Sequence, residues 1–241
     1  MKPEMLWEND LCLSLRLTPR LTLEHALQVH AMDSALARSG LPYIRARVPS
    51  YCTLMLHLRP DMPGIHEVEQ DIHQVLATVP EEHAERELDC MDIPVCYDPA
   101  FAPDMEQVIK ATGLDRAEVI RRHTALPLYV CMLGFLAGFP YLLGMDPMLA
   151  CPRKDQPALR IPGGSVGIAG RQTGIYPVES PGGWQIIGRT PLTLFSPDRC
   201  PAALLKSGML VRFRAIDGDE FARIQEKGIA YMPDIAREVI P

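Results

Sequence analysis

Hydrophobic positions recur with two different periods in the first hundred residues. Leucine alternates with smaller or polar residues over 11–17, which is the period of a half-buried strand. Over 23–38 the hydrophobic positions instead recur every four residues, with Thr22 in front and Gly40 behind, which predicts a capped helix. Further strands are predicted over 43–48, 51–58 and 87–97, and a second helix after Pro63–Gly64. The order β-α-β-β-α-β predicts an α+β domain of the ferredoxin-like type over residues 1–99.

A helical linker is predicted over residues 100–126. Asp104 is followed three positions later by Gln107, and Asp115 is followed by Glu118. Both spacings are typical of a capping box, so two short helices, 104–112 and 115–123, are expected.

The remainder, residues 127–241, changes to short hydrophobic runs separated by glycine and proline. Strands are predicted over 128–133, 158–161, 165–169, 174–176, 184–188 and 209–214, and a closing helix over 219–227. Several short strands with turn signals between them predict an antiparallel, all-β barrel.

Composition and charge exclude some classes of protein. The chain has 241 residues and a net charge of −6, so it lacks the basic footprint of a nucleic-acid-binding protein. Its 23 prolines are about twice the usual share, which favours a loop-rich fold. Seven scattered cysteines without a C-x-x-C pair indicate reduced thiols and a cytoplasmic protein.

One uncharged stretch, 125–145, is long enough to cross a bilayer. Five glycines and prolines within it would break a helix repeatedly, so a buried strand and a turn are expected instead of a membrane span. Acidic residues near the N-terminus also interrupt any signal peptide.

Candidate chemistry gathers between His123 and Arg189. Arg153 and Arg189 lie in turns that contain proline and glycine. A guanidinium in such a turn could bind a carboxylate or phosphate through two hydrogen bonds. The alternative is that each arginine is a solvated surface residue. His123 is expected either to interact with a helix C-terminus or to reach the mouth of the barrel. The neutral groups that could orient an amide are Ser165, Gln172, Thr173 and Tyr176, and Trp184 could supply an apolar wall or core packing.

Other signals are weaker. The remaining histidines, His25, His30, His57, His66, His73 and His83, lack metal-ligand spacing and are predicted to be solvated, so no metal site is expected. Glycines 164, 167 and 170 are spaced as in some phosphate loops, but no Gly-Lys-Ser/Thr follows, which favours turn glycines. No Ser-His-Asp order or G-x-S-x-G elbow supports Ser165 as a nucleophile.

A set of motifs carries a family resemblance. These are Gly-Phe-Pro-Tyr-Leu (138–142), Pro-Arg-Lys (152–154), Pro-Gly-Gly-Ser (162–165), Gln-Thr-Gly-Ile-Tyr-Pro (172–177), Ser-Pro-Gly-Gly-Trp (180–184) and Gly-Arg-Thr-Pro (188–191). In this order and spacing the chain resembles the allophanate hydrolase subunit 1 / KipI family. It departs from the family pattern at Ala137, Lys154, Gly163 and Ala158, where the family has proline, arginine, alanine and arginine.

The resemblance implies a cyclophilin-like barrel and a role as the B subunit of an ATP-dependent 5-oxoprolinase, which opens 5-oxo-L-proline to L-glutamate. It implies ATP in the assembled enzyme, no covalent cofactor, and two partners: the C subunit, with a related barrel, and the A subunit. His123, Gln172 and Arg153 are then expected to be catalytic. Arg189, Ser165, Thr173, Tyr176 and Trp184 are expected to bind the lactam, and the chain alone is expected to be inactive.

Other functions remain open from the sequence. Members of the KipI type bind and inhibit a sensor histidine kinase, which needs a protein-facing patch and no small-molecule chemistry. A component of a urea- or allophanate-hydrolysing system is a third possibility. A biotin-dependent carboxyltransferase would need biotin from another protein, because no Met-Lys-Met attachment motif is present. A prolyl isomerase would rest on the barrel alone, and fold does not carry function.

Overall fold

The computed structural model describes residues 2–17, 21–80 and 86–240, which form two compact units, Met1–Arg86 and Glu87–Ile240. The boundary expected after residue 99 therefore falls inside the second unit. His83 and the charged run over 81–85 lie outside the described residues.

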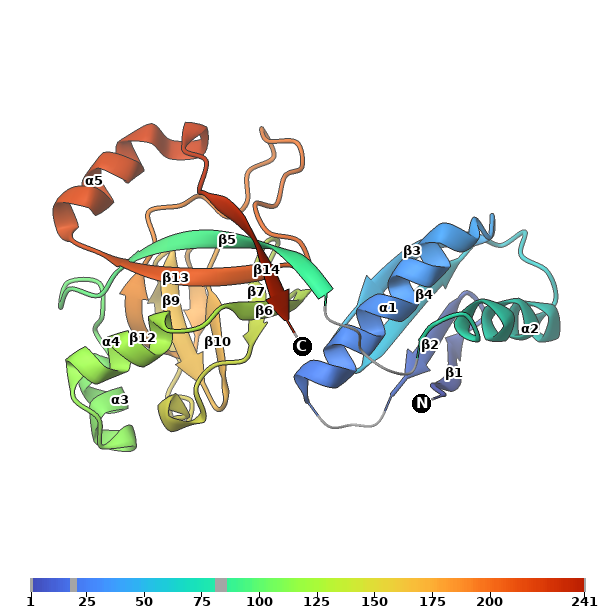
Figure 1. The fold of residues 1–241 in the computed structure, drawn as a ribbon, viewed down its shortest axis with the longest axis horizontal. Coiled ribbons are helices and arrows are strands. Elements are labelled where there is room, and N and C mark those ends of the chain that lie inside the picture. Colours follow the sequence, from blue (N-terminus) through green and yellow to red (C-terminus); the bar gives the residue numbers. More distant parts are fainter. Residues whose placement is uncertain (1, 18–20, 81–85, 241) are drawn as a thin grey trace. The chain divides into compact units, whose positions relative to one another are not determined.

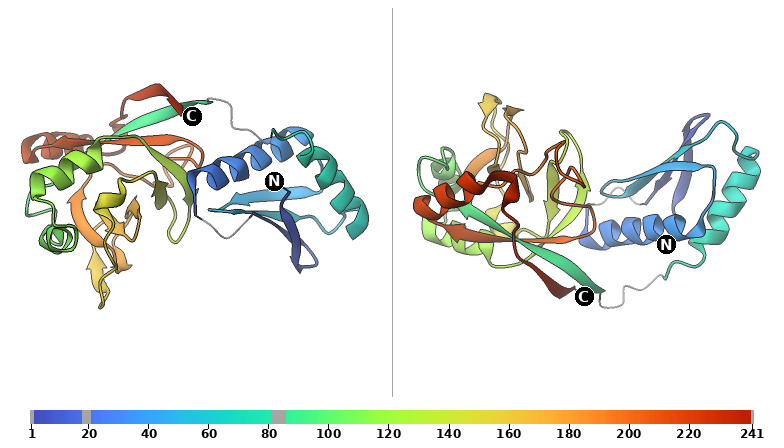
Figure 2. Two further views of the ribbon diagram at one scale, coloured as in Figure 1. Left: turned by 60° about the horizontal axis from the view of Figure 1, so that its bottom comes forward. Right: turned by 90° about the horizontal axis from the view of Figure 1, so that it is seen from above.

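The first unit is a four-stranded antiparallel sheet with two helices. Its sheet order is β1-β2-β4-β3. The elements are β1 (Glu4–Asn9), β2 (Cys12–Arg16), α1 (Leu23–Ser39), β3 (Ile44–Pro49), β4 (Thr53–Leu58) and α2 (Ile65–Leu76). Helix α1 runs along one face of the sheet, and both helices share a buried apolar cluster with β2 and β4 (Figure 2).

The ferredoxin-like prediction is wrong in its last strand. The predicted strand over 87–97 exists as β5 (Arg86–Cys96), but β5 pairs within the second unit. Strand β1, which the sequence patterns do not indicate, occupies the sheet edge beside β2. Strand β1 forms a hairpin with β2 and is its neighbour in the sheet. This sheet therefore has four strands without β5.

Capping signals set the ends of α1 as predicted. The hydroxyl of Thr22 accepts a hydrogen bond from the backbone N–H of His25 at 3.2 Å. Gly40 ends the helix with a left-handed φ of 67°. The prediction for the histidines holds only in part: His66 and His73 are exposed, whereas His25 and His30 are buried on α1.

The second unit is a closed barrel. Its sheet order is β12-β9-β10-β7-β6-β13-β5-β14, and a further pairing of β12 with β5 closes seven of these strands into a ring. The strands are β6 (Leu128–Leu133), β7 (Pro140–Leu143), β9 (Ser165–Ala169), β10 (Gln172–Ile175), β12 (Gln185–Arg189), β13 (Leu210–Ile216) and β14 (Ile235–Ile240). A barrel is thus confirmed, and its cyclophilin-like character stays a prediction.

One pair in the barrel departs from the predicted antiparallel pattern. Strands β5 and β13 run parallel, with Leu210 opposite Cys90 and Ile216 opposite Cys96. Figure 1 shows these two long strands side by side. A parallel pair requires a long crossover, and here more than a hundred residues intervene between the two strands.

Helices cover the barrel instead of serving as a separate linker. Met105 and Val108 of α3 (Met105–Thr112) and Val119 of α4 (Arg116–Thr124) belong to the barrel's buried core. A short ribbon, β8 (Ala158–Ile161) with β11 (Ser180–Gly182), stands apart from the closed ring. The remaining elements are the one-turn helices η1 (Pro147–Leu149) and η2 (Gly228–Ala230), and α5 (Gly218–Lys227), which matches the predicted closing helix.

Among the described residues, no helix is long and apolar enough to cross a membrane. The uncharged stretch over 125–145 contains β6, a turn and β7.

Candidate functional site

Asp104 and Lys154 form an ion pair that the sequence patterns do not reveal. Lys154 Nζ lies 2.6 Å from Asp104 Oδ2, and the two side chains are 21% and 11% exposed. The same carboxylate oxygen accepts a hydrogen bond from the backbone N–H of Ile186 at 2.7 Å, and the N–H of Asp104 donates to the carbonyl of Ile186 at 3.0 Å. Asp104 is therefore fixed to β12 at two points and holds the ammonium of Lys154.

This pairing corrects one prediction. Asp104 precedes α3, but its side chain makes no capping hydrogen bond. Asp115, the second predicted cap, does accept a hydrogen bond from the N–H of Glu118, at 2.8 Å. The carboxylate of Asp104 is engaged by Ile186 and Lys154, so it is not available to the N–H groups of the helix.

The ion pair lines a pocket of about 280 Å³, which we call the Lys154 pocket. Its lining residues are Ala100, Phe101, Pro103, Asp104, Lys154, Ala158, Arg160, Ile161, Pro162, Ser165, Ile186 and Arg189. Two of the predicted substrate-binding residues, Ser165 and Arg189, meet here, because they are paired neighbours on strands β9 and β12.

One of the three guanidinium nitrogens of Arg189 is hydrogen-bonded within the protein, and the other two are available to a ligand in the pocket. Its Nε donates to the carbonyl of Gly163 at 2.8 Å, and no other polar partner of its guanidinium is found among the described residues. Ser165 is 2% exposed and lines the same pocket. The pocket thus combines a half-buried guanidinium, a hydroxyl and an ammonium on an apolar floor.

A tight turn before Ser165 depends on glycine. Gly164 has a φ of 82°, and an added Cβ would lie 2.3 Å from the carbonyl oxygen of Thr190. Its N–H donates to the carbonyl of Tyr176 at 2.7 Å, and its carbonyl accepts from the N–H of Thr190 at 2.9 Å. The glycines at 164, 167 and 170 therefore lie in turns and in β9 and do not precede a helix, in agreement with the turn interpretation.

A second pocket of about 240 Å³, the aromatic pocket, contains three other predicted residues: Arg153, Tyr176 and Trp184. The guanidinium carbon of Arg153 lies 6.0 Å from the ring centroid of Trp184. Burial raises the pKa of the Tyr176 hydroxyl, so this group is a neutral hydrogen-bonding group at physiological pH. Phe135, Phe139 and Tyr141 complete the set of aromatic rings.

The ribbon β8–β11 contributes residues to both pockets. Gly182 of β11 lines the aromatic pocket, and Ile161 of β8 lines the Lys154 pocket. A Cβ on Gly182 would lie 2.3 Å from the Tyr176 hydroxyl oxygen and 2.8 Å from Ile161 Cδ1. The neighbouring cations Arg153 and Lys154 therefore line different pockets.

His123 lies in the core and not at a mouth of the barrel. It is 2% exposed, its ring stacks on Phe213 at 4.5 Å, and it lines neither pocket. Nδ1 is 2.8 Å from the hydroxyl of Tyr97, and Nε2 is 2.9 Å from the hydroxyl of Thr173. Burial lowers the pKa of His123 to about 3, so the imidazole is neutral at physiological pH.

Thr173 fixes the tautomer of this histidine. Its hydroxyl donates to the carbonyl of Gly167 at 2.9 Å, so the same oxygen must accept from Nε2–H of His123. Nδ1 then accepts from Tyr97. Gln172, the remaining predicted residue, is half-buried at the start of β10 and lines neither pocket.

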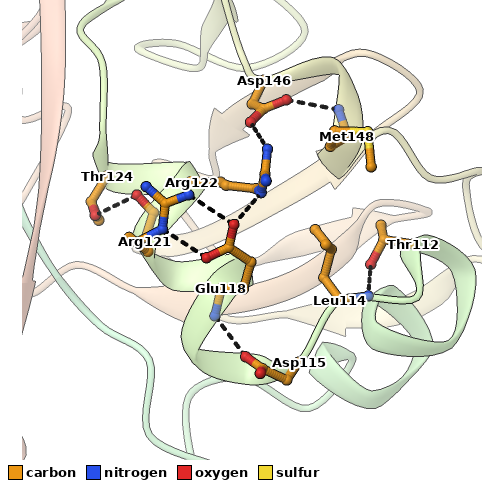
Figure 3. A network of polar contacts seen from close by, with 9 residues as sticks. All are labelled: Thr112, Leu114, Asp115, Glu118, Arg121, Arg122, Thr124, Asp146 and Met148. Carbon is orange, nitrogen blue, oxygen red and sulfur yellow. Dashed lines mark hydrogen bonds and ion pairs between the residues drawn. The ribbon is translucent and has the colours of Figure 1, made fainter.

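An ion-pair network joins α4 to the segment that precedes Arg153 and Lys154 in the chain (Figure 3). Glu118 of α4 pairs with Arg122 at 2.6 Å, and Arg122 pairs with Asp146 at 2.6 Å. Asp146 then accepts from the N–H of Met148 at 2.9 Å in η1. Hydrogen bonds and charge from Arg121 and Arg122 lower the pKa of Glu118 to about 2, so the network is ionised near neutral pH.

No group of three or more His, Cys, Asp or Glu side chains that could hold a metal ion occurs in the described part of the chain.

Comparison with known proteins places the chain in a family. Residues 3–205 match the family model described as carboxyltransferase domain, subdomain C and D. The B subunit of the 5-oxoprolinase of Bacillus subtilis (strain 168) is 40% identical over 209 residues, covering 83% of this chain and 87% of that protein.

Solved structures agree with this assignment. The crystal structure of TTHA0988 superposes with a TM-score of 0.74 and 34% identity, covering 86% of this chain and 40% of that chain. The K. lactis urea amidolyase shares the fold alone, with a TM-score of 0.80 at 16% identity over 99% of this chain and 16% of that chain. The motifs, the barrel and these matches agree, and the chain belongs to the carboxyltransferase subdomain C and D family, together with the B subunits of 5-oxoprolinase.

Proposed function

We propose that this chain is the B subunit of an ATP-dependent 5-oxoprolinase and acts with partner subunits. The observation that carries this proposal is the 40% identity to the B. subtilis protein, which extends over most of both chains. The C and A subunits of the enzyme are the proposed partners and ATP is the proposed co-substrate. The chain alone is proposed to be inactive. A reducing compartment such as the cytoplasm suits its seven free cysteines.

The reaction explains why a polar pocket is needed. The amide of 5-oxoproline resists attack by water, and transfer of a phosphoryl group from ATP to its oxygen would create a leaving group. Water then adds to the ring carbon and the C–N bond breaks, which frees the amine and leaves an acyl phosphate. A second water cleaves this acyl phosphate, so that glutamate, ADP and phosphate are formed. The site must bind a small carboxylate, orient an amide and stabilise developing negative charge.

The predicted residues fit this chemistry in different ways. Arg153, Tyr176 and Trp184 share the aromatic pocket, and Ser165 and Arg189 share the Lys154 pocket. Arg153 and Gln172, which were expected to be catalytic, remain proposed functional residues, although neither lines the pocket that contains Ser165 and Arg189.

For His123 we propose a positioning role in place of the proton transfer expected from the sequence. Both of its nitrogens are engaged inside the core, and its pKa lies far below neutral. Thr173 is proposed to take part in the same support of β10.

The test is the formation of glutamate and ADP from 5-oxoproline and ATP, with the chain and its partner subunits combined. Arg153→Gln and Gln172→Ala are expected to lower kcat/KM in this mixture. Arg38→Gln changes an exposed cation of α1 and serves as the control. Full activity of both site variants would overturn the assignment of the two residues while leaving the proposed function intact.

A further inference from the structure

We propose that the Lys154 pocket binds the lactam substrate, with Arg189 holding its carboxylate and Lys154 its ring carbonyl oxygen. This inference rests on the proposed function for the identity of the lactam. The sequence patterns do not identify Lys154 or Asp104 as substrate-binding residues. The two residues come together only in the folded chain, where both line this pocket.

The charges of the pocket favour a small monoanion. Asp104 balances Lys154 at 2.6 Å, and Glu179 balances Arg160 at 2.7 Å on the exposed rim. Arg189 then stays as the one cation of the pocket lining without a carboxylate partner in the described residues. One unpaired guanidinium suits one carboxylate, which it can bind through two parallel hydrogen bonds.

The geometry prepares Arg189 for this role. Its Nε is committed to the carbonyl of Gly163, so the plane of the guanidinium is fixed before a ligand arrives. The turn that presents this carbonyl is itself constrained, because Gly164 adopts a φ of 82° with no room for a side chain. A fixed guanidinium loses less conformational entropy on binding than a mobile one.

Lys154 is equally fixed. Its backbone N–H donates to the carbonyl of Gly183 at 2.7 Å, and its ammonium is held by Asp104, which β12 anchors at two points. An ammonium carries three N–H donors. With one donor on Asp104, the others can reach a carbonyl oxygen in the pocket and stabilise negative charge that develops on it.

The remaining walls match the body of a five-membered lactam. Phe101, Ile161 and Ile186 supply apolar surface, and Ser165 adds a hydroxyl. The volume of about 280 Å³ accommodates a ligand of this size with room for a further reactant.

The experiment compares two ligands and two matched lysines. In the assembled enzyme, KM for 5-oxoproline is measured for wild type, Arg189→Gln and Lys154→Gln. The control is Lys206→Gln, which changes an exposed lysine that also pairs with an aspartate, Asp89, at 3.2 Å. Binding of 5-oxoproline and of pyrrolidin-2-one, which lacks the carboxylate, is measured by calorimetry on the same samples.

We expect Arg189→Gln to weaken 5-oxoproline by about 10- to 100-fold, the usual effect of losing a charged hydrogen bond, and to leave pyrrolidin-2-one unchanged. Lys154→Gln is expected to weaken both ligands and to lower kcat, and Lys206→Gln to change nothing. Because a folding defect would affect both ligands alike, the selective effect of Arg189→Gln keeps the test informative.

The failures can be told apart. Wild-type turnover of 5-oxoproline with unchanged KM and kcat in both variants would overturn the pocket assignment and leave the proposed function standing. Absence of turnover in the wild-type assembly would overturn the proposed function, and calorimetry would still decide the pocket. If both variants then bind both ligands as tightly as the wild type does, the pocket assignment is overturned in that case too.

Discussion

His123 and Thr173 share a hydrogen bond of 2.9 Å between Nε2 and the threonine hydroxyl, inside the core of the barrel. The bond joins α4 to β10, two elements about fifty residues apart. With Tyr97 on the other ring nitrogen, it makes the histidine a neutral, fully engaged structural group. The protonation of this ring and the hydroxyl that holds it each have a measurable effect on stability.

The first prediction concerns pH. The folded pKa of His123 is about 3, below its ordinary value of 6.5. In the interval between these values the unfolded chain binds one more proton, so the free energy of unfolding falls by about 1.4 kcal/mol per pH unit as the pH is lowered. The stabilising effect is complete above pH 6.5 and is lost as the pH approaches 3.

Urea unfolding at pH 7, 6 and 5 measures this slope. The difference between wild type and His123→Gln is expected to shrink as the pH falls, because the variant lacks the proton-linked term. Parallel pH profiles for the two proteins would contradict the assignment of a neutral core histidine.

The second prediction concerns the hydroxyl of Thr173. Thr173→Val keeps the shape of the side chain but leaves Nε2–H of His123 unpaired and removes one hydrogen bond from the carbonyl of Gly167, since both bond to this oxygen. Unpaired buried polar groups cost about 1–3 kcal/mol each, so a loss of at least 1 kcal/mol in the free energy of unfolding is expected. Thr78→Val, at an exposed residue that follows the C-cap of α2, serves as the control and is expected to be nearly neutral.

Adjacent glycines in the ribbon provide a third prediction. Gly182→Ala would place a Cβ 2.3 Å from the Tyr176 hydroxyl oxygen, whereas Gly183→Ala would meet its nearest neighbour, the carbonyl oxygen of Lys154, at 3.8 Å. Overpacking typically costs about 1–3 kcal/mol, and we expect that loss for Gly182→Ala only. Equal melting temperatures for the two variants would show that the ribbon does not pack tightly against Tyr176.

A fourth prediction concerns the thiols. Cys200 is exposed, whereas Cys90, Cys96, Cys131 and Cys151 are buried. Burial raises the pKa of Cys90 and of Cys151 to about 11, which keeps both as unreactive thiols. Labelling of the folded protein with a thiol reagent is expected to modify Cys200 first. A Cys200→Ser variant that still labels at the wild-type rate would contradict this order.

Local signals in the sequence predict local structure well in this chain. Thr22 and Gly40 set the ends of α1, and the strands over 128–133, 158–161 and 165–169 are found with the predicted bounds. The N-cap expected at Asp115 is also correct, although the Glu118 side chain pairs with Arg121 and Arg122 and does not complete the predicted capping box. In each case the deciding contacts lie within a few residues of the signal.

Long-range contacts explain the errors. The sequence predicts the strand over 87–97, but no local pattern indicates that its neighbour is β13, more than a hundred residues away. Asp104 carries a capping signal, and only the folded barrel brings Ile186 and Lys154 to its carboxylate. The glycine- and proline-containing turns identify Arg153 and Arg189 as candidates. Their placement in two different pockets depends on the ribbon β8–β11, which contributes residues to both.

The most direct test of the central claim is an omission experiment. Glutamate and ADP formed from 5-oxoproline and ATP are measured for the chain alone, for the partner subunits alone, and for the complete mixture. The account predicts product only in the complete mixture, with glutamate and ADP in equal amounts. Equal activity of the partner subunits with and without this chain would contradict its role as the B subunit.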